Sequence, residues 1–261
     1  MLYAPCPMRF AFKGNKMKNL VLLLTITLLA TGQTDYPNGD YILRRIDENL
    51  RANNRTSESK MIVHSRRSDR TIEARSWIQG TSKSFTEYLA PPRDQGTKML
   101  KLDDQLWTYS PSTDRIIKIS GHMLRQSVMG SDLSYEDLME DPLLHNTYTA
   151  KVIGEDELNG RACWVLDLTA VKEDVPYHTR KIWVDKERYL PLKEHRFAKS
   201  GKLLKTTEIK EVQYVQNRWF LKHVVFKDVL KNGEGTELIL DKLQFDVDIP
   251  EHIFSKAVLR K

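Results

Sequence analysis

Between residues 58 and 247 the chain contains short runs in which two sets of side chains alternate, as in β-strands. Residues typical of turns separate these runs. The run at 72–78 alternates Ile, Ala and Ser with Glu, Arg and Trp, and Asn159-Gly160 is a strong two-residue hairpin signal. A spacing of about 8–12 residues between turns predicts an antiparallel sandwich or barrel of roughly ten to eleven strands. No linker or internal repeat interrupts the pattern, so the sequence predicts one domain.

Several of these runs carry large apolar side chains on both faces. Ile182 and Val184 belong to one face of their run and Trp183 to the other. A sheet with one solvated face needs only one apolar face. The surplus would pack beneath helices, line a ligand cavity or form a protein interface. The pattern leaves these three alternatives open.

A single clear helix precedes the strands, between Tyr36 and Asn53. Ile42, Ile46 and Leu50 recur at a spacing of four residues and form one apolar stripe. Either Asn38 or Asp40 is a suitable N-cap. The stripe predicts a helix that covers one part of the sheet.

The N-terminus has the pattern of an export signal. Lys16 and Lys18 precede an apolar run at residues 20–30, which is shorter than the ~20 residues that span a bilayer. Small residues follow the run, which favours cleavage before Gln33, and Met17 is the expected true start. A retained N-terminal anchor is the alternative.

Residues 1–32 are therefore expected to be a signal peptide, and residues 33–261 the folded domain. The signal peptide holds four of the 41 basic residues and no acid, so the domain keeps 37 basic and 35 acidic residues. This near balance, together with export, argues against nucleic-acid binding. No cysteine follows the apolar run before Cys163, which excludes lipid attachment at a new N-terminal cysteine.

The chain shows no catalytic spacing. None of the seven histidines forms a recognised metal-binding motif, and Cys163, in the middle of a strand, is expected to be buried and inert. The acidic pairs Glu136-Asp137 and 140–141 follow Ser134, and we interpret them as the first turn of a capped helix. The sequence therefore predicts no enzyme, no metal site and no cofactor.

The region between Leu106 and Glu140 changes character abruptly. Two strand-like runs, 106–110 and 116–119, lead into a Met-rich segment at residues 122–129 and then into the capped helical segment. Methionine side chains are flexible and polarisable, so they adapt to an apolar partner. The segment therefore indicates a surface for apolar matter.

This region resembles the signature of the outer-membrane lipoprotein-sorting-protein-like domains of the LolA/LolB/RseB superfamily. The segment 36–50 is similar to the N-terminal helix of that family, and 182–193 is similar to its central strand pair. The resemblance implies a mainly β (α+β) fold: one strongly curved antiparallel sheet forming an incomplete β-barrel. The N-terminal helix and the Met-rich segment, as a helical lid, would cover it.

The resemblance also implies a periplasmic carrier that shields the acyl chains of a lipoprotein or another lipid. Its partners would include an inner-membrane transporter complex, and the protein would be a monomer. An RseB-like lipid-sensing or protein-interaction module is the alternative. Arg66 and Arg75 are candidates for the functional arginine of the lipoprotein carrier. The expected lipid-contacting residues come from early strands, the strand at 106–110 and the Met-rich segment: Met61, Val63, Ile72, Trp107, Tyr109, Met123, Leu124, Val128 and Met129.

Overall fold

The computed structural model describes Met1, residues 35–65 and residues 68–260. The chain divides into two units, Met1–Asp35 and Tyr36–Lys261. The second unit contains all the helices and strands described below. Apart from Met1, the predicted signal peptide and its cleavage site lie outside the described residues. Within the described ranges, no helix is both long and apolar enough to cross a membrane.

Thirteen strands form one antiparallel sheet with two free edges, β6 and β7. The strand order is β6-β5-β4-β3-β2-β1-β13-β12-β11-β10-β9-β8-β7. The strands are β1 (Asn54–Val63), β2 (Arg70–Gln79), β3 (Lys83–Ala90), β4 (Lys98–Leu102), β5 (Gln105–Ser110), β6 (Arg115–Ile119), β7 (Tyr148–Leu158), β8 (Arg161–Ala170), β9 (Thr179–Asp185), β10 (Pro191–Phe197), β11 (Leu203–Val215), β12 (Arg218–Asp228) and β13 (Thr236–Phe245).

Consecutive strands are neighbours throughout the sheet, except where β1 pairs with β13. The two edge strands, β6 and β7, follow one another in the sequence. Residues 120–147, which we call the crossover segment, must therefore pass from one edge of the sheet to the other. This segment contains the Met-rich residues.

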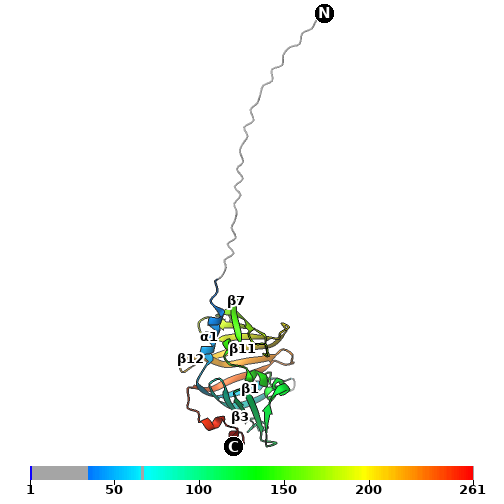
Figure 1. Cartoon of the computed structure of the whole chain (residues 1–261), viewed down its shortest axis with the longest axis vertical. Helices are drawn as coiled ribbons and strands as arrows, with labels where there is room; N and C mark the ends of the chain where they lie inside the picture. The colour runs from blue at the N-terminus through cyan, green and yellow to red at the C-terminus, as the bar shows by residue number, and fades with distance from the viewer. Residues whose placement is uncertain (2–34, 66–67, 261) are drawn as a thin grey trace. The chain divides into compact units, whose positions relative to one another are not determined.

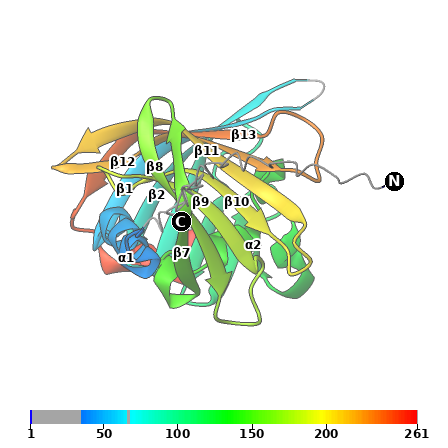
Figure 2. The same cartoon turned by 90° about the horizontal axis from the view of Figure 1, so that it is seen from above.

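The sheet is strongly curved. Lys101 of β4 and Lys205 of β11 both reach the short helix α2 (Tyr135–Met139) in the crossover segment, through Leu138 O and Asp137. These strands are six places apart, which is about 29 Å in a flat sheet. The sheet must therefore curl around α2, and Figure 2 shows β7–β10 in front of β1 and β2. The predicted incomplete barrel is confirmed, with one sheet instead of a sandwich.

Helix α1 (Gly39–Leu50) packs on the concave, or inner, face of this sheet. Asn38, one of the two predicted N-caps, accepts a hydrogen bond of 3.0 Å from the Tyr41 N–H. Its apolar stripe is buried against residues of β7, β8 and β9, including Leu166 and Ile182. A Cβ on Gly39 would lie 2.4 Å from the Ala150 carbonyl oxygen, so only glycine allows this close approach to β7.

The crossover segment is less helical than the sequence predicts. The Met-rich part forms two 3₁₀ turns, η1 (Gly121–Arg125) and η2 (Val128–Gly130), instead of a regular helix. The turn η3 (Leu144–Asn146) follows α2. Ser134 and Asp137 form a reciprocal capping box at the start of α2, which confirms the predicted helix start.

The C-terminal turns η4 (Glu251–Phe254) and η5 (Lys256–Arg260) pack on the opposite, or outer, face. They cover an apolar cluster on β3, β4 and β5, which includes Trp107, and Figure 1 shows them near β3. The hairpin at Asn159-Gly160 forms as predicted, with both residues at positive φ. Strand β4 was not predicted, because its five residues KMLKL lack a clear alternation.

Candidate binding site

An apolar row crosses five neighbouring strands on the inner face. Each residue is directly paired with the next, so all five side chains lie on one face. We call these residues the apolar row: Ile72 of β2, Met61 of β1, Leu238 of β13, Val224 of β12 and Ile209 of β11. All except the half-buried Leu238 are buried. The row provides a continuous apolar path across the concave face.

The crossover segment covers one end of this row. Met129 packs against the cluster that contains Met61, Ile72 and Tyr88, and its carbonyl accepts a hydrogen bond from Arg70 of β2. The neighbouring Val128 is 4% exposed. Apolar side chains of the segment therefore cover the end of the apolar row at Met61 and Ile72.

A second row on the same face is charged. Arg180 of β9, Arg196 of β10 and Lys205 of β11 are paired in sequence across the sheet, and we call them the cation row. The Arg180 side chain is 3% exposed, and the other two are 13% exposed. Like charges at directly paired positions repel one another, so the row requires anionic partners.

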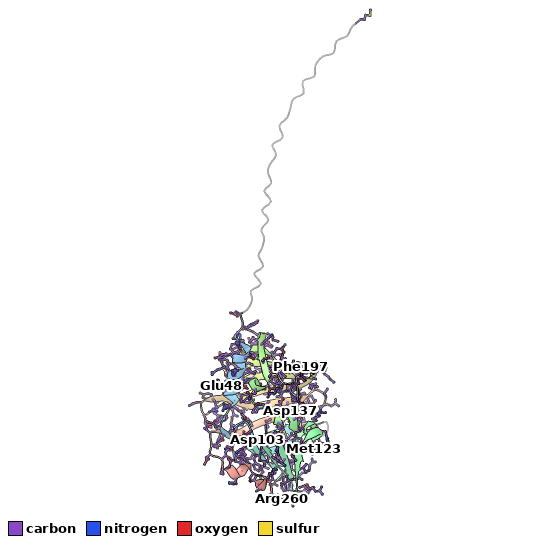
Figure 3. The ribbon with its side chains drawn as sticks, in the orientation of Figure 1. Glu48, Asp103, Met123, Asp137, Phe197 and Arg260 are labelled. Atoms are coloured by element: carbon purple, nitrogen blue, oxygen red, sulfur yellow. The ribbon has the colours of Figure 1, made fainter. Side chains whose placement is uncertain are left out.

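Three carboxylates supply these partners. Glu194 of β10 accepts hydrogen bonds from Arg180 at 2.8 Å and Arg196 at 3.0 Å. Asp137 of α2 binds Lys205 and lies 3.4 Å from Arg196, whereas Glu140 binds Arg180 and lies 3.6 Å from Arg196. In the view of Figure 3, Asp137 lies in the middle of the domain, between Met123 and Phe197. The network therefore joins the crossover segment to three strands.

The two carboxylates of the crossover segment titrate differently. Burial raises the pKa of Asp137, but Lys205 and Arg196 outweigh burial and lower this pKa to about 2. For Glu140, burial outweighs Arg180 and Arg196 and raises the pKa. Asp137 is therefore the more firmly ionised partner of the cation row.

Two further carboxylates attach the crossover segment, one near its middle and one near its C-terminal end. Asp132 accepts hydrogen bonds from the Thr236 hydroxyl at 2.8 Å and the Asp228 N–H at 2.9 Å. Asp47 of α1 accepts the N–H groups of Leu144 at 3.1 Å and His145 at 3.0 Å. Polar contacts thus fasten the segment along its length.

A cavity of about 270 Å³ lies where the crossover segment meets β11 and β12. Tyr177, Lys205 and Lys231 contribute to its lining, together with Leu204 and Leu230. It is an amphipathic hollow beside the cation row.

The structure brings several of the predicted lipid-contacting residues together. Met61 and Ile72 belong to the apolar row, Val63 lies beside them, and Met129 packs on the same cluster. Met123 and Leu124 are half-buried in η1, outside this cluster.

Trp107 and Tyr109 lie on the outer face instead. Trp107 is buried beneath the C-terminal turns, and the Lys256 Nζ lies 4.1 Å from its ring centre. Tyr109 packs against the same cluster, and its hydroxyl lies 3.3 Å from Asp114. These two residues are therefore separated from Met61, Val63 and Ile72 by the thickness of the sheet.

Sequence reasoning missed the cation row. Arg180, Arg196 and Lys205 occupy three different strands, and only the register of the sheet aligns them. Of the two arginine candidates, Arg75 pairs with Glu58 at 2.7 Å on the outer face, and Arg66 lies outside the described residues.

The described residues include one free cysteine. Cys163 is fully buried on the outer face, and burial raises its pKa to about 11. Within residues 35–65 and 68–260, no group of three or more His, Cys, Asp or Glu residues is arranged to hold a metal ion.

Residues 80–261 match the model of a protein family that is described as "Uncharacterized protein". No curated protein matches the chain.

Three solved structures share the fold over 85% of this chain. A DUF1329 family protein from Desulfovibrio piger has 23% identity and a TM-score of 0.78, with 97% of that chain covered. A putative outer membrane lipoprotein-sorting protein domain from Vibrio parahaemolyticus has 24% identity and a TM-score of 0.76 over 98% of that chain. A LolA superfamily protein from Nitrosomonas europaea has 20% identity and a TM-score of 0.71 over 100% of that chain. These similarities confirm the fold expected from the sequence motif.

Proposed function

The chain belongs to the family whose model covers residues 80–261 and has the LolA-like fold, and from this premise we propose that it is a periplasmic carrier of acylated cargo. The cargo would be the acyl chains of a lipoprotein or another lipid. The protein binds and releases this cargo and catalyses no reaction. It acts as a monomer and exchanges cargo with an inner-membrane transporter complex.

One observation supports this proposal above the others. One end of the apolar row is covered by the crossover segment, which is also attached through the polar contacts of Asp132, Asp137 and Glu140. Displacing the segment would expose the end of the apolar row at Met61 and Ile72 without unfolding the sheet. Burial of an acyl chain there contributes on the order of 0.8 kcal/mol per methylene group, which favours a long chain.

The first test measures binding of a fluorescent fatty-acid probe to delipidated protein. We expect saturable binding, and we expect Met61→Gln to weaken it about tenfold, because a polar group enters the apolar row. Ile153→Gln is the matched control, since Ile153 is 50% exposed on β7. No binding, or equal weakening by both substitutions, would contradict the carrier function.

The second test asks whether the crossover segment moves. In the closed form the Val128 N–H donates to Leu133 O at 2.8 Å, and the Tyr135 N–H donates to Gln126 O at 3.1 Å. Bound probe should increase hydrogen exchange at these amides, whereas the α1 amide of Ile42 should stay protected. If a protein complex and no lipid co-purifies from the native host, the interaction-module alternative is favoured.

A further inference from the structure

The charges around the cation row come from two separate parts of the fold. The sheet itself contributes Arg180, Arg196, Lys205 and one carboxylate, Glu194. The other two carboxylates, Asp137 and Glu140, belong to the crossover segment. When this segment lifts, the inner face keeps an excess of two positive charges. Glu194 balances only one of these three positive charges, so the open face attracts an anionic group.

The two arginines also have unused donors. Arg180 Nε and Arg196 Nε are buried, and neither donates a hydrogen bond to any of the described residues. The planar guanidinium group suits bidentate binding of carboxylate and phosphate oxygens. The Tyr177 hydroxyl, which donates a hydrogen bond of 2.6 Å to Asp137, is a neutral donor beside the cation row. This donor set fits an oxyanion.

The cation row lies within reach of the apolar row. Lys205 and Ile209 are four residues apart on the same face of β11, and no bulge separates them. This spacing corresponds to about 13 Å along the strand. An amphiphile with a charged head and an acyl tail has polar and apolar parts at such a separation.

We propose that Arg180, Arg196 and Lys205 bind the anionic headgroup, a phosphate or carboxylate, of the amphiphile whose acyl chain occupies the apolar row. In the closed form Asp137 and Glu140 occupy the headgroup position and compete with the ligand. This inference rests on the carrier function proposed above and specifies its class of substrate.

The test compares two probes with the same acyl chain. Oleoyl lysophosphatidic acid carries a phosphate headgroup, and monooleoylglycerol is neutral. We expect the protein to bind the phosphate-bearing probe about tenfold more tightly, because charge-assisted hydrogen bonds form only with that probe. Its affinity should fall as salt rises, whereas that of the neutral probe should not.

Substitutions at the cation row should remove this preference. Lys205→Gln should reduce the difference between the probes to about threefold or less. Lys210→Gln is the matched control, since Lys210 is on the same strand and pairs with the exposed Glu208. Circular dichroism confirms folding of each variant, and the salt dependence of the unmodified protein gives an independent measurement.

Competition by the crossover segment predicts a gain of affinity. Asp137→Asn should tighten binding of the phosphate-bearing probe about threefold to tenfold, because the competing carboxylate is removed. A purely structural role of Asp137 would weaken the binding of both probes or leave it unchanged, and either result would overturn the inference.

The outcomes separate the two proposals. Equal binding of the two probes would refute the headgroup site and leave the carrier function intact. Failure of both probes to bind would refute both proposals. Equally tight binding of inorganic phosphate alone would show a free-anion site and overturn the headgroup assignment.

Discussion

The carboxylate of Asp137 accepts a hydrogen bond of 2.6 Å from the hydroxyl of Tyr177, which lies in the loop before β9. The same carboxylate binds Lys205 and caps α2 together with Ser134. One side chain thus starts a helix and attaches that helix to the sheet. Loss of its charge should affect both functions.

Asp137→Asn should lower the free energy of unfolding by about 2 kcal/mol at neutral pH. The pKa of Asp137 is lowered to about 2 in the folded protein, against about 3.9 in an unfolded chain. A lowered carboxyl pKa stabilises the fold above the unfolded value, and this stabilisation is lost as pH falls from about 4 towards 2. The variant and the unmodified protein should therefore converge at low pH, as measured by urea denaturation. Glu136→Gln is the control, and a difference that does not depend on pH would contradict the argument.

Asp132→Ala should destabilise the protein by about 2–4 kcal/mol, because the buried Thr236 hydroxyl and the Asp228 N–H lose their acceptor. Urea denaturation gives the magnitude. Asp104→Ala, at an exposed turn, should change stability by less than about 0.5 kcal/mol. Similar effects of both substitutions would show that the attachment of the crossover segment at β13 is unimportant.

Asp47→Ala should loosen the crossover segment locally. The N–H groups of Leu144 and His145 lose their acceptor, so their hydrogen exchange should accelerate while the amides of β8 stay protected. Glu48→Ala serves as the comparison, since Glu48 pairs with Arg45 on the surface of α1. Unchanged exchange at both amides would argue against this attachment.

Trp107→Ala should destabilise the fold by about 3–5 kcal/mol through a cavity beneath the C-terminal turns. Because Trp107 lies on the outer face, the affinity of the folded variant for an acyl probe should equal that of the unmodified protein. Phe254→Ala removes a side chain from the opposite side of the same cluster. It should likewise destabilise the fold and leave the affinity for the acyl probe unchanged. Weaker probe binding in both variants would instead support the lipid contact predicted for Trp107 from the sequence.

Local patterns predicted the local structure well. The apolar stripe of α1, the Asn159-Gly160 hairpin and the Ser134 capping box each depend on residues close in sequence, and each is confirmed. Strand β4 was missed because its lysines and apolar residues do not separate cleanly onto two faces.

The site was harder to predict because it depends on register across distant strands. The alternation of β5 shows that Trp107 and Leu106 point to opposite faces, but it does not show which face is concave. The cation row is aligned only by the pairing of β9, β10 and β11. The sequence therefore indicated that an apolar surface exists, and the curvature of the sheet determined which residues form it.

The pairing of β1 with β13 has a consequence for the order of assembly. Every other pairing in the sheet joins strands that follow one another along the chain, so these hairpins can form early and locally. The β1–β13 contact closes a loop that spans almost the whole domain, and such closures are slow. We expect the two meanders to form first and the concave face to be completed only when the last strand docks.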